Sequence, residues 1–135
     1  MSTAKNIFLS IHDMPLAAST RRVGVTVDAG ASVISTGIKG YVRCPLTGQF
    51  SAWSLVADQA GDLVFDVWVH SWGTLPTDSD SITGGNGPTL SSAAMASDTT
   101  LSGWTKPVNA GDVIAFNVDS ASTVTRVTLV LEIKP

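Results

Sequence analysis

The amino-acid sequence predicts a single all-β domain with a jelly-roll-like antiparallel β-sandwich fold, and three observations support this. Apolar and polar residues alternate over many short runs, whereas helical periodicity is absent. Turn-forming residues separate the runs at Asp28–Gly30, Pro45–Gly48, Asp58–Gly61 and Asn109–Gly111. Only 14% of the 135 residues are charged and Glu132 is the only glutamate, so strong helix formers with charged side chains are scarce. The length fits one domain.

The clearest predicted strands lie in the second half of the chain, where strict alternation indicates which side chains face the core. In the last strand Val127, Leu129, Leu131 and Ile133 share one face. The full set of expected strands is Ile7–Ile11, Val23–Val27, Ile38–Arg43, Phe50–Ala57, Leu63–Val69, Asp112–Asp119 and Arg126–Ile133. Short strands at this spacing are typical of a sandwich or a small barrel.

One stretch, Ser71–Lys106, interrupts the alternation and is rich in hydroxyl residues, glycine and proline. We expect a long excursion with short strands around Thr89–Ser91 and Leu101–Trp104, and one helical turn within Ser92–Ala96. Because long loops inside a small domain are usually functional or ordered by packing, this region is the first place to look for a site.

Several classes of function lack support in the sequence. The net charge of −3 leaves no basic patch for nucleic acid, and no segment is apolar and long enough for a membrane helix. His12 and His70 have no partner at metal-binding spacing, and the acidic run at Asp78 lacks the pattern of a calcium loop. Cys44 stands alone, and Asp66 is a single carboxylate within an apolar strand. We therefore expect no enzyme activity, no metal and no cofactor.

The candidate contact residues for a ligand or partner are Trp68, Trp72, Trp104 and Asn86. Exposed tryptophans stack on sugar rings and anchor interfaces, but they also fill sandwich cores. Packing is favoured for Trp104, and for Trp68 and Trp72 both interpretations stay open. Asn86 lies in the Gly-rich run Thr83–Gly87, which has no lysine for binding phosphate.

From Gly37 onward a series of short segments resembles a module of tailed-bacteriophage virion proteins. The segments are Gly37–Pro45, Gly48–Asp62, Val64–Trp68, Asp80–Gly84, Pro88–Ser91, Leu101–Trp104, Ala110–Ser122 and the last strand. More distantly, Gly111-Asp112 before the penultimate strand resembles the trimeric jelly rolls of the complement-globular and tumour-necrosis-factor type. The resemblance implies a β-sandwich without catalysis, usually displayed as trimers on a virion.

From these observations we expect the chain to have two parts. Residues 1–36 form an N-terminal arm with one or two strands that docks on a partner, and residues 37–135 form the sandwich module. We expect a structural protein made in the host cytoplasm and placed on the surface of the phage particle. In the main hypothesis it is a capsid decoration, or cement, protein that binds the major capsid protein and itself as a homotrimer. The alternative is a tail-fibre or receptor-binding tip that joins a tail protein and recognises a host-surface glycan.

Overall fold

A computed structural model describes residues 19–135 and confirms an all-β, antiparallel β-sandwich of the jelly-roll-like class. The expected strand Ile7–Ile11 lies outside the described residues. The elements are β1 (Arg21–Asp28), β2 (Gly37–Arg43), β3 (Gly48–His70), the 3₁₀ helix η2 (Asp78–Asp80), β4 (Thr89–Asp98), β5 (Pro107–Val108), β6 (Val113–Ser122) and β7 (Arg126–Lys134).

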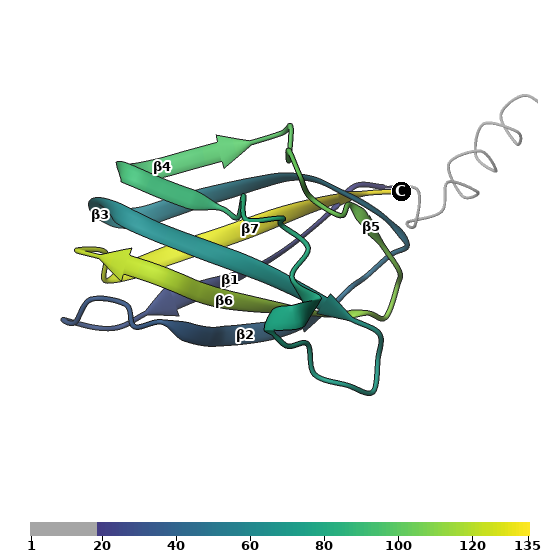
Figure 1. Cartoon of the computed structure of the whole chain (residues 1–135). Coiled ribbons are helices and arrows are strands. Elements are labelled where there is room, and N and C mark those ends of the chain that lie inside the picture. Colours follow the sequence, from purple (N-terminus) through teal and green to yellow (C-terminus); the bar gives the residue numbers. More distant parts are fainter. Residues whose placement is uncertain (1–18) are drawn as a thin grey trace, which may run out of the picture.

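The sandwich is a long antiparallel ribbon that is folded back on itself at one end (Figure 1). The first half of β3 pairs with β7, and its second half pairs with β6. β4 follows the other edge of β3, while β1 pairs with β7 and β2 with β6. One layer therefore has the order β1–β7–β3–β4, and the other has the order β2–β6–β3–β4. The two layers are continuous through β3 and β4.

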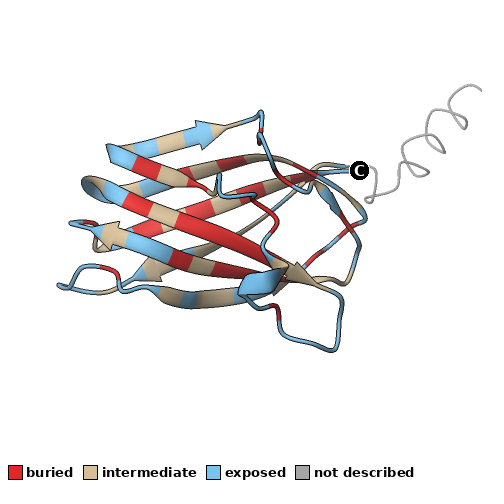
Figure 2. Ribbon diagram, in the orientation of Figure 1, coloured by how far each residue is buried: buried red, intermediate tan, exposed pale blue. Residues whose placement is uncertain are grey.

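The core lies between the inner faces of these layers, and buried residues alternate with more exposed ones along the strands (Figure 2). The faces predicted from alternation are correct for β6, β7 and the second half of β3. The fully buried large side chains include Leu63, Phe65, Val67, Ile114, Phe116, Leu129, Leu131 and Ile133. In the first half of β3 a register shift between Phe50 and Ala52 lets both Phe50 and Trp53 face the core.

The predicted turn at Asp58–Gly61 is wrong, because β3 continues through it as one bent strand of 23 residues. Strand pairing shifts its register near this point, and the turn-forming residues serve the bend instead of ending the strand. A Cβ atom at Gly61 would lie 2.7 Å from the carbonyl oxygen of Ser122. Glycine thus allows the bent strand to approach its neighbour closely.

Three further expectations need correction. The helical turn predicted within Ser92–Ala96 is instead the middle of β4, since the free edge of β3 offers hydrogen-bond partners that outweigh weak local preference. Residues Leu101–Trp104 form no strand.

The strand expected at Val23–Val27 is present as β1, but β1 pairs with β7 over eight residues and belongs to the sandwich. The boundary expected after residue 36 therefore does not separate an arm from the domain.

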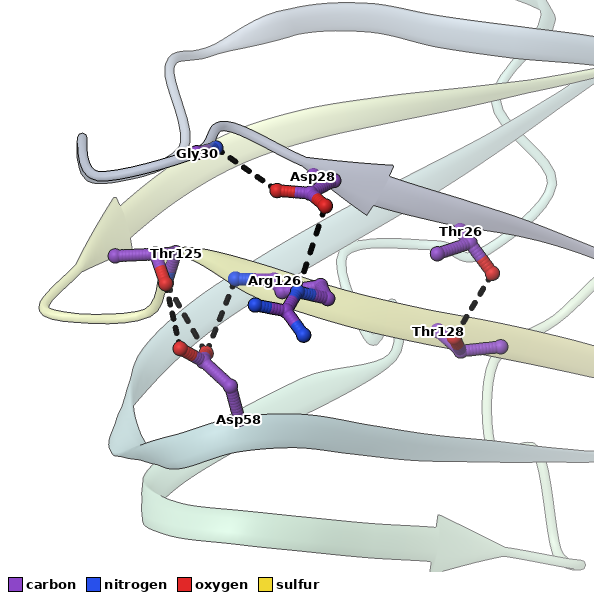
Figure 3. Close-up of polar contacts among 7 residues, drawn as sticks. All are labelled: Thr26, Asp28, Gly30, Asp58, Thr125, Arg126 and Thr128. Atoms are coloured by element: carbon purple, nitrogen blue, oxygen red, sulfur yellow. Dashed lines mark hydrogen bonds and ion pairs between the residues drawn. The ribbon is translucent and has the colours of Figure 1, made fainter.

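A polar clasp centred on Asp58 ties the folded end of the ribbon together (Figure 3). Its carboxylate accepts hydrogen bonds from the backbone N–H groups of Thr125 and Arg126, at 3.2 and 3.0 Å, and from the Thr125 hydroxyl. The Arg126 guanidinium lies 3.5 Å from the Asp28 carboxylate, which also accepts a bond from the Gly30 N–H. The clasp thus joins the bend of β3, the β6–β7 turn and the end of β1.

The clasp makes stability depend on the ionised form of Asp58. The Thr125 hydroxyl and then the backbone N–H groups hold the pKa of Asp58 below its usual 3.8. Because the pKa is lowered by folding, this contribution is present above pH 3.8 and is lost as the pH falls through the folded-state pKa. We predict that Asp58→Asn lowers the Tm at pH 7 by several degrees. The difference in Tm between this variant and the unmodified chain should become smaller in acid.

Asp119→Asn is the matched control for this experiment. Burial, followed by repulsion from Asp66 and Asp78, raises the pKa of Asp119, so its charge opposes folding at neutral pH. This variant should therefore keep or raise the Tm at pH 7 in thermal unfolding followed by circular dichroism. Equal Tm values for Asp58→Asn and the unmodified chain at pH 7 would contradict the clasp.

Candidate functional site

The structure does not bring the four predicted contact residues together on one surface. Trp68 and Trp104 are 7% and 8% exposed, and both pack into the domain. Trp72 is 66% exposed, and Asn86 is exposed in the chain between β3 and β4. Two of the four candidates are therefore accessible to an external partner, and they belong to different parts of the excursion.

Trp104 and Asn86 act together in packing. The Trp104 indole N–H donates to the Asn86 carbonyl at 2.8 Å, and the Asn86 side-chain amide donates to the Ser102 carbonyl at 3.0 Å. A Cβ atom at Gly84 would lie 2.4 Å from the carbonyl oxygen of Gly103. The Gly-rich run is therefore required for close contact between two backbone segments, which explains its composition without a ligand.

Asp66 holds the excursion against the outer side of β3. Its carboxylate accepts hydrogen bonds from the Trp68 indole N–H at 2.9 Å, the Ser81 hydroxyl at 2.7 Å, the Thr83 hydroxyl at 2.8 Å and the Val67 N–H at 2.9 Å. Asp66 is 8% exposed, and these donors satisfy a buried carboxylate that forms no ion pair within residues 19–135. The arrangement anchors a loop, and it fixes the Trp68 indole on the same outer face of β3 as Asp66, outside the core between the layers.

The accessible candidate surface surrounds Trp72, immediately after β3. The Arg43 guanidinium stacks on the Trp72 ring with its central carbon 4.1 Å from the ring centroid. Residues 72–75 and Val113 line a shallow hollow of about 240 Å³. Leu75, one of these lining residues, is 62% exposed. We call Arg43, residues 72–75 and Val113 the Trp72 surface. The Trp72 ring can stack on a sugar ring, and the guanidinium beside it can donate hydrogen bonds to the hydroxyl groups of that sugar.

Arg43 and Leu75 belong to this surface but were not predicted from the sequence. Arg43 ends β2, which is joined to the β3 layer only through β6, where Arg43 pairs with Val113. This proximity depends on the order of strands in the sheet, and no local pattern in the sequence encodes it. Trp72 was among the predicted contact residues because exposed tryptophans can anchor interfaces.

Other chemistry is limited in the part of the chain that the structure describes. No group of three or more metal-ligating side chains comes together among residues 19–135, and none of the helices in that range is long and apolar enough to cross a membrane. Cys44 is buried, and burial raises the pKa of its thiol, which keeps it protonated.

No protein-family model, curated protein or solved structure matches this chain. The resemblance to phage virion modules therefore stays a prediction, and function has to be inferred from the surfaces that the fold presents.

We predict that Asp66→Ala lowers the free energy of unfolding by about 3 kcal/mol, because four donors lose their acceptor in a buried position. Urea unfolding at neutral pH measures this change. Asp78→Ala is the control, since Asp78 is an exposed carboxylate of the same excursion. If both variants unfold at the same urea concentration, Asp66 does not anchor the loop.

Proposed function

We propose that this chain is a structural protein of a bacteriophage virion. In this proposal it is a capsid-surface decoration, or cement, protein that binds the major capsid protein and other copies of itself as a homotrimer. The jelly-roll-like sandwich and the resemblance of the segments from Gly37 onward support the proposal. A rigid sandwich with scarce charge is suited to permanent contact with other proteins.

The observation that carries the proposal is an uncharged patch on the outer surface of the layer that contains β1 and β7, bordered by the ion pairs Arg22–Glu132 and Arg126–Asp28. We call this surface the β3–β4 face; its outward residues are Ala52, Ser54, Val56, Met95, Ser97, Thr128 and Val130. Val56 is 51% exposed and Met95 is 70% exposed, and the two are paired across β3 and β4. A shallow hollow of about 350 Å³ lies over this pair.

The composition of the β3–β4 face favours association. Covering it removes apolar area from water and requires no charged group to lose its hydration. At the margin of the face Arg22 and Glu132 form an ion pair at 3.0 Å, so they already satisfy each other. A surface of this kind is suited to a capsid, where one side of the domain stays covered for the life of the particle.

Light scattering of the purified chain should give about three times its mass of 14.0 kDa. Labelled antibody against the chain should mark phage heads evenly in electron micrographs. A chain that is monomeric both at high concentration and on the particle would reject the homotrimer. Label confined to tails would reject the capsid location.

The Trp72 surface supports a second candidate, a tail-fibre or receptor-binding tip that recognises a host-surface glycan. If the chain has this function, Trp72→Ala should weaken its binding to purified host-surface polysaccharide by about tenfold or more, as for an aromatic anchor. Met95→Ala, which removes an exposed side chain on the other layer, should leave this binding unchanged. Binding that is equally strong in both variants, or absent from the unmodified chain, would remove the support that Trp72 gives to this candidate.

A further inference from the structure

We propose that β4 is an acceptor edge for strand addition, and that the segment Ile7–Ile11 of a neighbouring copy pairs with it. The inference rests on the self-association in the proposed function and specifies how that association is made. It assigns a role to the free edge of β4 and to the apolar part of the N-terminal segment.

The free edge of β4 lacks the charges and prolines that normally protect sheet edges, and its irregular part around Ser92 (φ 48°) precedes residues 95–98, which pair with β3 in one register. Within residues 19–135, β4 pairs only with β3, so alternate backbone N–H and C=O groups along its other edge face outward. Residues 89–97 read Thr-Leu-Ser-Ser-Ala-Ala-Met-Ala-Ser, without a charge or a proline. Such an edge is a template for another strand.

The opposite side of the sandwich is different. β1 carries Arg22 and Asp28, and β2 carries Lys39 and Arg43. These two strands also pack against each other across the layers, since a Cβ atom at Gly40 would lie 3.2 Å from a methyl group of Val25. Charges and mutual packing thus protect this side, whereas β4 has neither along residues 89–97.

The segment Ile7-Phe8-Leu9-Ser10-Ile11 has the composition of a strand for this edge. It is uncharged and contains β-branched and aromatic residues. An added strand extends the layer, so its alternate side chains lie beside the outward residues of β4, among them Met95. Pairing with Ile7–Ile11 would therefore also cover exposed apolar surface at the margin of the β3–β4 face.

The length of chain before β1 indicates that the segment comes from a neighbour. β1 begins level with Phe50 of β3, whereas β4 ends level with Trp53, at the other side of the layer. If Ile7–Ile11 paired antiparallel with the last five residues of β4, Ile11 would lie roughly 35 Å from Ser19. This distance combines about nine residue positions along the strands with about four strand spacings across the layer. Eight residues span at most about 29 Å. Its own segment therefore cannot reach β4 in this orientation.

The orientation and the resulting symmetry agree with the proposed homotrimer. All strand pairs that the structure records are antiparallel, which is the orientation assumed in the distance argument. Donation of a segment from one copy to the next is a head-to-tail contact, in which donor and acceptor surfaces differ. Contacts of this kind form a closed ring or an open filament, depending on the rotation between copies, and the proposed homotrimer corresponds to a ring of three.

Hydrogen exchange measured by mass spectrometry tests the pairing in the full chain. Leu9→Asp places a charge inside the proposed strand, and Ser2→Asp is the control that adds the same charge outside it. We expect the peptide covering β4 to exchange at least about tenfold more slowly in the unmodified chain and in Ser2→Asp than in Leu9→Asp. Equal exchange of β4 in all three would overturn the inference.

Mixing copies distinguishes a neighbour from the same chain. Isotope-labelled Leu9→Asp is unfolded and refolded with an excess of the unmodified chain, and exchange is followed in the labelled copies alone. Their β4 should regain protection, because intact neighbours supply the segment. Labelled copies whose β4 stays unprotected, while the unmodified chain is protected, would show pairing within one chain and overturn the inference.

Light scattering of the same samples separates this inference from the proposed function. A chain that forms trimers with an unprotected β4 would overturn strand addition and leave the proposed self-association standing. A chain that is monomeric at every concentration, on and off the particle, would reject both.

Discussion

The structure depends on one constraint: the long strands must all bend, or end in a turn, at the same end of the domain. If β3 bends at Asp58–Gly61, its partner must break into β6 and β7 at the same level, and β1 must end there as well. The Asp58 carboxylate sits between these turns and bonds to Thr125 and Arg126. Backbone bonds from Ala29 to Thr125 and from Ile34 to Val124 complete the junction. The bend and the turns at this end therefore determine how the two layers lie over each other.

The folded ribbon also places the two candidate surfaces on different outer faces. The Trp72 surface lies with β2 and β6, because Arg43 pairs with Val113 there, whereas the β3–β4 face lies on the layer that contains β1 and β7. A partner on one layer therefore leaves the other accessible. This separation lets the uncharged face be covered in an assembly while Trp72 remains exposed, so the two surfaces need not compete for one partner.

The fold class and most core positions could be predicted from sequence because they depend on local alternation, as in Ile114 to Val118 and Val127 to Ile133. The bend of β3 could not, because Asp58–Gly61 has turn composition and only pairing with distant strands keeps it extended. The candidate site was predicted in part. The same residue type is buried as Trp68 and exposed as Trp72, and the difference comes from Asp66, an acceptor whose partners Ser81 and Thr83 come from a distant part of the loop.

The scarcity of charge has a consequence for the edge of β4. A free domain with an uncharged edge invites uncontrolled pairing between copies, which natural sheets normally prevent with charges or proline. Here the protection is absent from the edge itself, and a short segment that precedes β1 has the composition to supply it. Ordering that segment costs conformational entropy, which backbone pairing and apolar burial at Met95 must offset. A head-to-tail contact of this kind closes into a ring only if the rotation between copies allows it, and the proposed homotrimer is such a ring, in which every β4 edge is covered by the segment of its neighbour.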